Sequence, residues 1–132
     1  MNEVKSLNPK DAWSFISAQP NAVLLDVRDP TEFAFVGHPL KAVNIPLKVA
    51  PSWKPNPHFV DDVHQRISNR NTPILLLCRS GQRSLDAAKA LAAAGYTNLT
   101  NIEEGFEGPL DADKHRGTQG GWRANGLPWE QS

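Results

Sequence analysis

The sequence predicts an α/β fold with a mainly parallel central sheet that is covered by helices on both faces. Two observations carry this prediction. Short runs of aliphatic and β-branched residues alternate with longer segments of helical pattern, and the connections between them have ordinary lengths. One run, residues 74–77, is apolar without interruption, which is typical of a central parallel strand whose two faces are both buried.

The first half of the chain is predicted to begin with a helix. Asn8 can cap it, Pro9 suits its first position, and it stops before Pro20. The other elements expected in this half are strands at residues 23–27 and 42–45, a short helical turn at 31–35, and an ordered, proline-rich loop at 47–57.

The second half is predicted to continue the alternation. A helix from Pro57 to about Ile67 carries apolar residues at helical spacing. A second helix, residues 84–94, consists of good helix formers and ends at Gly95. The remaining expected elements are strands at 74–77 and 99–102, a loop rich in glycine and charge at 104–121, and one helical turn at 122–125.

Composition and charge exclude several classes of protein. The 132 residues, 39% of them hydrophobic, fit one globular domain over residues 1–132. Balanced charge, 14 basic against 14 acidic residues, argues against broad electrostatic binding to nucleic acid or to an anionic membrane. A single cysteine excludes a disulfide framework and a multi-cysteine metal site. We therefore expect a small cytoplasmic domain that binds no metal, no nucleic acid and no membrane.

The lone cysteine follows the most apolar predicted strand. Residues 78–84 read Cys-Arg-Ser-Gly-Gln-Arg-Ser and lead from that strand through a tight loop into a helix, with no acidic residue. Backbone N–H groups of such a loop can form an anion nest, and the helix adds its positive end. Together with Arg79 and Arg83 they favour a thiolate over a thiol, so Cys78 is a candidate nucleophile. A cysteine that serves packing alone would not need the glycine and two arginines that follow.

Two charged residues end a neighbouring predicted strand. Asp26 and Arg28 lie on the same side of the sheet as Cys78 if the sheet is parallel. We expect them either to line the pocket or to form a structural ion pair.

The loop resembles the active-site loop of the rhodanese (sulfurtransferase) family. The segment Leu25-Asp-Val-Arg-Asp-Pro-Thr-Glu-Phe33 resembles the upstream signature of that family. Further matching positions follow in register: Gly37-His38, Asn44-Ile45-Pro46, Gly95-Tyr96, Glu104-Gly105-Phe106 and the segment from Trp122 to Pro128. The resemblance covers almost the whole chain. It implies a rhodanese-like fold, with a five-stranded, mainly parallel sheet flanked by helices on both faces.

The resemblance also implies an activity. A thiosulfate sulfurtransferase-like enzyme would move a sulfane sulfur from thiosulfate or a similar small anion to cyanide, a thiol or a partner protein. Cys78 would carry the sulfur as a persulfide, with no bound cofactor, and the acceptor would be external because the chain has no second cysteine. The residues implied to bind the donor and the persulfide are Arg79, Ser80, Gly81, Gln82, Arg83 and Ser84. Arg79 would orient the donor, and Arg83 would do the same or only brace the loop.

Two alternatives stay open. One is a persulfide carrier or protein-interaction module with little turnover of thiosulfate. The other is a cysteine phosphatase or arsenate reductase, although those loops have five residues between cysteine and arginine, and only four separate Cys78 from Arg83. Residues 108–121 lengthen the usual link before Trp122, and we expect them to form a solvated loop or to fold over the cysteine.

Overall fold

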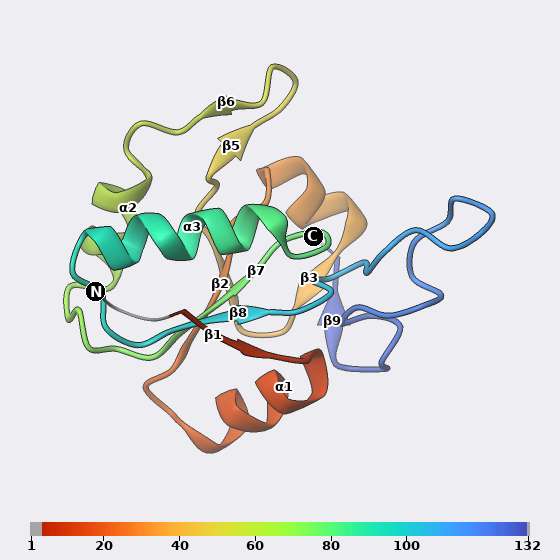
Figure 1. Cartoon of the computed structure of the whole chain (residues 1–132), viewed down its shortest axis with the longest axis horizontal. Helices are drawn as coiled ribbons and strands as arrows, with labels where there is room; N and C mark the ends of the chain where they lie inside the picture. The colour runs from red at the N-terminus through yellow and green to blue at the C-terminus, as the bar shows by residue number, and fades with distance from the viewer. Residues whose placement is uncertain (1–3, 132) are drawn as a thin grey trace.

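The computed structural model describes residues 4–131 and is built around a five-stranded parallel sheet (Figure 1). The strand order is β1-β8-β7-β2-β4. The strands are β1 (Val4–Leu7), β2 (Val23–Asp26), β4 (Ala42–Asn44), β7 (Ile74–Leu77) and β8 (Leu99–Ile102). Strand β7 lies in the middle, paired in parallel with β2 and β8. The predicted α/β fold with a parallel sheet is confirmed.

Helices cover both faces of the sheet (Figure 1). They are α1 (Pro9–Ala18) on one face and α2 (Phe59–Arg66) with α3 (Gln82–Ala93) on the other. Alternate residues of β7 divide between the two cores: Ile74 and Leu76 join the cluster of α2 and α3, whereas Leu75 and Leu77 join that of α1. This division explains why the run is apolar without interruption. Within the described part of the chain, no helix has the length and apolar character needed to cross a bilayer.

Local capping decides where the first helices begin. The Asn8 side chain accepts the Asp11 N–H at 2.8 Å, as the prediction for α1 requires. Helix α2 begins at Phe59, two residues later than predicted. The reason is Asn56, whose side-chain oxygen accepts the His58 N–H at 3.0 Å and holds the chain in a turn before the helix.

Several strands of the structure were not predicted from the residue pattern. Strand β1 forms one edge of the main sheet, pairing with β8. Two short antiparallel pairs accompany the sheet: β3 (His38–Pro39) with β9 (Trp129–Glu130), and β5 (Lys48–Val49) with β6 (Lys54–Pro55). The second pair is a hairpin, so the segment predicted as an ordered proline-rich loop contains regular structure.

The segment 108–121 extends away from the sheet (Figure 1). It is held by its own hydrogen bonds: the Asp111 carboxylate accepts the His115 N–H at 2.9 Å, and at its base Glu104 accepts the Gly121 N–H at 2.7 Å. The residues at its tip are exposed. The tip of the segment is therefore solvated, which is one of the two arrangements expected from the sequence.

Candidate active site

Cys78 directly follows β7 and lies beneath the loop that leads into α3. That helix begins at Gln82, two residues earlier than predicted, because Gly81 adopts a φ of 119° and turns the chain into the helix. The Gly81 N–H donates to Cys78 Sγ at 3.0 Å. Only 1% of the Cys78 surface is exposed. The sulfur is therefore enclosed by the loop, with a backbone donor from the start of α3 directed at it.

Ser84 is a second donor to the sulfur and belongs to a buried network. Its Oγ lies 3.4 Å from Cys78 Sγ, 3.1 Å from the Gly81 carbonyl and 2.5 Å from Asn101 Oδ1. Asn101, on β8, also donates its Nδ2 to the Gly81 carbonyl at 3.3 Å. A hydroxyl has one hydrogen, so these three acceptors compete for it. Asn101 was missed by the sequence analysis, and its one signal was a polar residue within a short predicted strand.

The backbone of the loop rests on the segment that follows β8. The Phe106 N–H donates to the Cys78 carbonyl at 2.8 Å, and the Glu107 N–H donates to the Arg79 carbonyl at 3.0 Å. Gly105 has a φ of 63°, and a Cβ added there would lie 2.5 Å from the Cys78 carbonyl oxygen. Glycine therefore permits an approach of two backbones that a side chain would block.

Arg83 is held by Glu32, which lies in the π-helical turn η1 (Glu32–Val36). The two arginine Nη atoms meet the two carboxylate oxygens at 2.7 Å and 3.0 Å. Burial lowers the pKa of Arg83 and raises the pKa of Glu32. The hydrogen bonds and opposite charges of the pair outweigh burial, so the Arg83 pKa is raised and the Glu32 pKa is lowered. Arg83 thus braces the loop against η1, one of the two roles that the sequence analysis left open.

Glu32→Gln is expected to lower the free energy of unfolding at neutral pH by about 1–2 kcal/mol, because an amide cannot pair with the Arg83 charge. Since the folded-state pKa of Glu32 is lowered, the pair stabilises the fold fully above about pH 4.3, where an unfolded-chain glutamate titrates. This stability is lost as the pH falls through the folded-state value. Urea unfolding measured from about pH 7 to about pH 3 should therefore show that the difference in the free energy of unfolding between wild type and variant becomes smaller as the pH falls. If this difference in free energy did not change with pH, the Glu32–Arg83 ion pair would not be its cause.

Asp26 and Arg28 form a buried ion pair at the carboxyl end of β2. Both side chains are 0% exposed, and Arg28 Nη2 lies 2.7 Å from Asp26 Oδ2. Arg28 Nη2 also donates to the Gly37 carbonyl at 2.6 Å, and the guanidinium lies 4.7 Å from the centre of the Phe106 ring. The structure therefore places these residues beneath the surface as a structural pair, the second of the two arrangements expected for them.

Two cavities adjoin the Cys78 loop. The smaller, about 210 Å³, is lined by Lys48, Trp53, Arg79 and Arg83. The larger, about 440 Å³, shares Trp53 and Arg79. Its other lining residues are Asp29, Thr31, Glu32, Phe35, Val36, Ala50, Glu107 and Arg116. Arg79 is exposed and lies in the wall of both cavities, where it can contact an anion.

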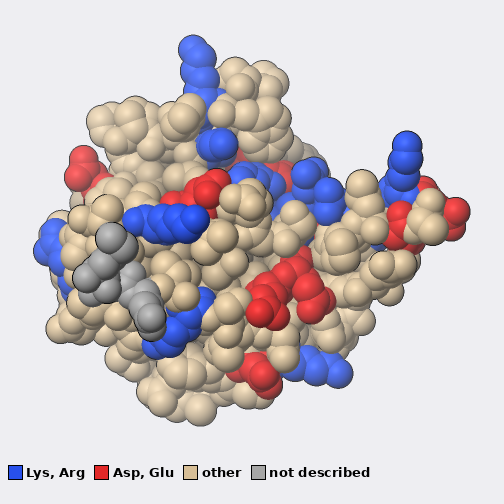
Figure 2. All heavy atoms as spheres, in the orientation of Figure 1, with Lys and Arg blue, Asp and Glu red and all other residues tan. Residues whose placement is uncertain are grey.

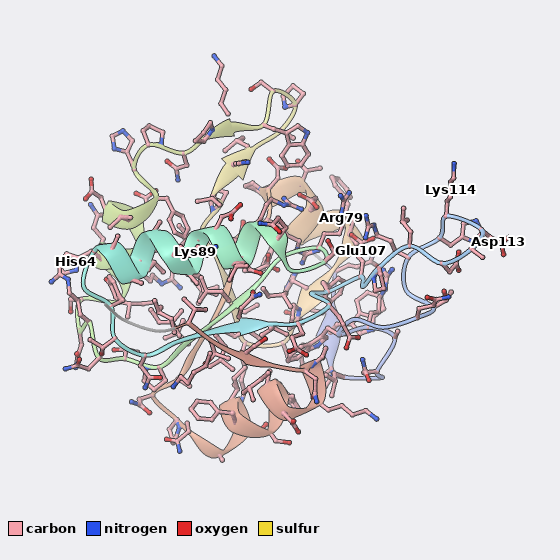
Figure 3. All side chains as sticks on the ribbon, in the orientation of Figure 1. His64, Arg79, Lys89, Glu107, Asp113 and Lys114 are labelled. Atoms are coloured by element: carbon pink, nitrogen blue, oxygen red, sulfur yellow. The ribbon has the colours of Figure 1, made fainter. Side chains whose placement is uncertain are left out.

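The remaining candidate residues have exposed side chains. Ser80 lies at the outer face of the loop, and the Gln82 amide donates to Asp86 within α3 at 3.1 Å. Figure 3 shows Arg79 and Glu107 near the base of segment 108–121, with Asp113 and Lys114 at its far tip. Among residues 4–131, no three His, Cys, Asp or Glu side chains are grouped so that they could hold a metal ion.

Comparisons with known proteins show which family the chain resembles. The family model described as Rhodanese-like domain matches residues 8–111. The protein named Uncharacterized protein RP600, from Rickettsia prowazekii (strain Madrid E), is 35% identical over 132 residues, covering 96% of this chain and 98% of its own. Thiosulfate sulfurtransferase 16, chloroplastic, from Arabidopsis thaliana is 33% identical over 106 residues, covering 79% and 76%.

A solved structure is similar over its whole length. The crystal structure of Rv0390 from M. tuberculosis is 40% identical in sequence and superimposes with a TM-score of 0.89, covering 99% of this chain and 100% of that one. The resemblance drawn from the sequence is confirmed: the chain belongs to the rhodanese-like domain family.

Proposed function

We propose that this chain is a sulfurtransferase that carries a sulfane sulfur as a persulfide on Cys78. The observation that carries the proposal is the hydrogen-bonding of its Sγ, which accepts from the Gly81 N–H and the Ser84 hydroxyl at the start of α3. These donors stabilise negative charge on sulfur. Family membership and the sulfurtransferase relative support a sulfurtransferase-family role. We further propose that thiosulfate is the sulfur donor.

The reaction consists of two half-reactions. The Cys78 thiolate attacks the outer sulfur of thiosulfate, so that a new S–S bond forms and the donor's S–S bond breaks, its electron pair leaving with sulfite. Cyanide then attacks the outer sulfur of the persulfide, forming thiocyanate and returning the thiolate. Neither step needs an external oxidant or reductant. Covalent transfer of this kind gives ping-pong kinetics.

The enclosure of Cys78 restricts which donors can react. With 1% of the residue exposed, the donor must present a terminal sulfur atom, and the two residues that follow Cys78 in the chain, Arg79 and Ser80, are exposed. A sulfane-sulfur anion has such a terminal atom, and the Arg79 charge attracts it.

Two features favour sulfur over phosphate as the transferred group. Four residues, not five, separate Cys78 from Arg83. In addition, both terminal nitrogens of Arg83 are bonded to Glu32, so this arginine is occupied and does not offer its fork to a phosphate.

Intact-mass analysis after donor treatment tests the proposal. Protein incubated with thiosulfate should gain the mass of one sulfur atom and lose it when cyanide is added, with thiocyanate formed. Protein whose Cys78 has first been alkylated with iodoacetamide is the control and should gain nothing. A cysteine that neither alkylates nor accepts sulfur from any donor would contradict the proposal.

A persulfide carrier is the second candidate, and two exposed apolar residues in the wall of the larger cavity favour it: Phe35 is 72% exposed and Trp53 is 45% exposed. Apolar surface gathered at one place is typical of contact with a protein partner. The same mass measurement separates the two functions. A carrier gains sulfur only when a persulfide-bearing enzyme supplies it, whereas a thiosulfate sulfurtransferase gains it from the small anion alone.

A further inference from the structure

Asn101 is a buried amide on β8 that lies beside the start of α3. It is 8% exposed, and its neighbour Ser84 is 0% exposed. Figure 2 shows acidic and basic side chains mixed over this face of the protein, where water and salt screen them. The two groups that donate hydrogen bonds to Cys78 Sγ, the Gly81 N–H and the Ser84 hydroxyl, are neutral and lie below that surface. Asn101 contacts the residues that carry both of them.

The orientation of the Asn101 amide follows from its two partners. The Gly81 carbonyl can only accept a hydrogen bond, so it selects Nδ2, which lies 3.3 Å away. Oδ1 then faces the Ser84 hydroxyl at 2.5 Å. This is the shortest of the three distances from Ser84 Oγ, since the Gly81 carbonyl lies at 3.1 Å and Cys78 Sγ at 3.4 Å. Asn101 is therefore the strongest competitor for the single hydroxyl hydrogen.

The position of that hydrogen depends on the charge of the sulfur. A Cys78 thiol can donate its S–H to Ser84 Oγ, which leaves the hydroxyl hydrogen on Asn101. A thiolate has only lone pairs, so the hydroxyl must turn its hydrogen to the sulfur and give up the bond to Asn101. In a persulfide the negative charge lies on the outer sulfur and Sγ carries none, so the hydrogen can return to Asn101. Each change of charge at Sγ thus moves one hydrogen bond.

Building on the proposed transfer at Cys78, we propose that Asn101 is a positioning residue that competes with the sulfur for the Ser84 hydrogen. Its bond opposes ionisation of the thiol, and it keeps the thiolate less stabilised and therefore more nucleophilic. It also satisfies the buried hydroxyl when the charge moves from Sγ to the outer sulfur. The step is a rotation of a hydroxyl group, in which no covalent bond breaks and no electron is transferred.

The pH at which half of the Cys78 thiol is ionised tests this competition. Because the chain has one cysteine, the ultraviolet absorbance of its thiolate, measured against Cys78→Ser, reports that midpoint without a reagent. Asn101→Leu removes the acceptor and should lower the midpoint by about 0.5–1 pH unit, because the hydroxyl then donates to the sulfur. Ser84→Ala removes the hydrogen and should raise the midpoint. In the Ser84→Ala background, Asn101→Leu should not lower it, because no hydroxyl is left to release.

The two backgrounds separate competition from support of the loop. Loss of the bond from Asn101 Nδ2 to the Gly81 carbonyl acts in both backgrounds, so the difference between the two shifts isolates the competition for the hydrogen. The charged residues around the loop are the same in all four proteins: Arg79, Arg83, Glu104 and the buried pair of Asp26 and Arg28. An equal shift by Asn101→Leu in both backgrounds, or no shift in either, overturns the inference.

Alkylation rates provide a second measurement. At a pH well below the wild-type midpoint, iodoacetamide should react with Asn101→Leu about two- to threefold faster, because more thiolate is present. Well above both midpoints it should react about two- to threefold more slowly, because the better-stabilised thiolate is the weaker nucleophile. A packing defect that only opened the loop would raise the rate at every pH, and that result would also overturn the inference.

Thr100→Val is the matched control. Thr100 is a buried polar residue of the same strand that lies on the opposite face from Asn101, so this change should leave the midpoint as in the wild type. If Asn101→Leu does not fold, Asn101→Ala takes its place, and a midpoint equal to that of the wild type overturns the inference. If the midpoints shift as expected but no donor forms a persulfide, the proposed function fails and the control of the thiol by Asn101 stands.

Discussion

Cys78→Ser is expected to abolish persulfide formation and to lower sulfur transfer by at least about a thousandfold. A serine hydroxyl remains protonated at neutral pH and forms no persulfide, so the first half-reaction has no nucleophile. Thiocyanate formation and intact mass, measured on the same samples, check this result. Retention of transfer by the variant would assign the chemistry to another group and remove Cys78 from the mechanism.

A matched variant separates the nucleophile from its surroundings. Ser84→Ala keeps the Cys78 sulfur and removes one of its two hydrogen-bond donors. It should slow transfer by about ten- to a hundredfold, less than the loss of the nucleophile, while the persulfide is still detected by mass. Thermal unfolding of Cys78→Ser should remain close to that of the wild type, whereas Ser84→Ala should unfold at a somewhat lower temperature, because the buried Asn101 Oδ1 loses its donor. If Cys78→Ser were unfolded, its loss of activity would say nothing about the nucleophile. The rate of Ser84→Ala would then be the result that tests the mechanism.

The parts of the fold that could be predicted are those whose signal is local. Residues 74–77 are buried on both faces, so their composition alone indicates a central strand. Strand β1, with two exposed residues in the middle of its four, has no such signal, because an edge strand is fixed by the pairing of its backbone with β8. The β5–β6 hairpin is also held by backbone pairing, and its prolines suggested a loop.

The site also combines residues that a local sequence signal reveals with residues that only long-range contacts bring together. The Cys78 loop was found because seven consecutive residues carry its chemistry. Its partners come from distant parts of the chain: Glu32 is 51 residues away from the arginine that it holds, and Asn101 reaches Ser84 from β8. Trp53 adjoins the site because the β5–β6 hairpin places its ring beside the Arg83 guanidinium. Contacts of this kind depend on tertiary packing, which spacing along one sequence does not reveal.

Asp26→Ala is expected to lower the free energy of unfolding by about 3–5 kcal/mol, because it leaves the fully buried Arg28 guanidinium without its counter-charge. That loss is a large fraction of the stability of about 5–15 kcal/mol that is typical of such proteins. Urea unfolding at neutral pH measures it, and the slope of the transition should not change. Asp26 does not contact the Cys78 sulfur and lines neither cavity. The variant molecules that remain folded should therefore still form the persulfide.

A double variant distinguishes the loss of a counter-charge from the loss of packing. Asp26→Leu combined with Arg28→Met replaces the pair by apolar side chains and should recover most of the stability lost in Asp26→Ala, because no unpaired charge remains buried. Arg28 Nη1 makes no hydrogen bond within the described residues, so the wild-type pair already leaves one buried donor unsatisfied, and replacing it removes that cost. A double variant no more stable than Asp26→Ala would show that the pair acts through its shape and its bond to the Gly37 carbonyl, and not through charge.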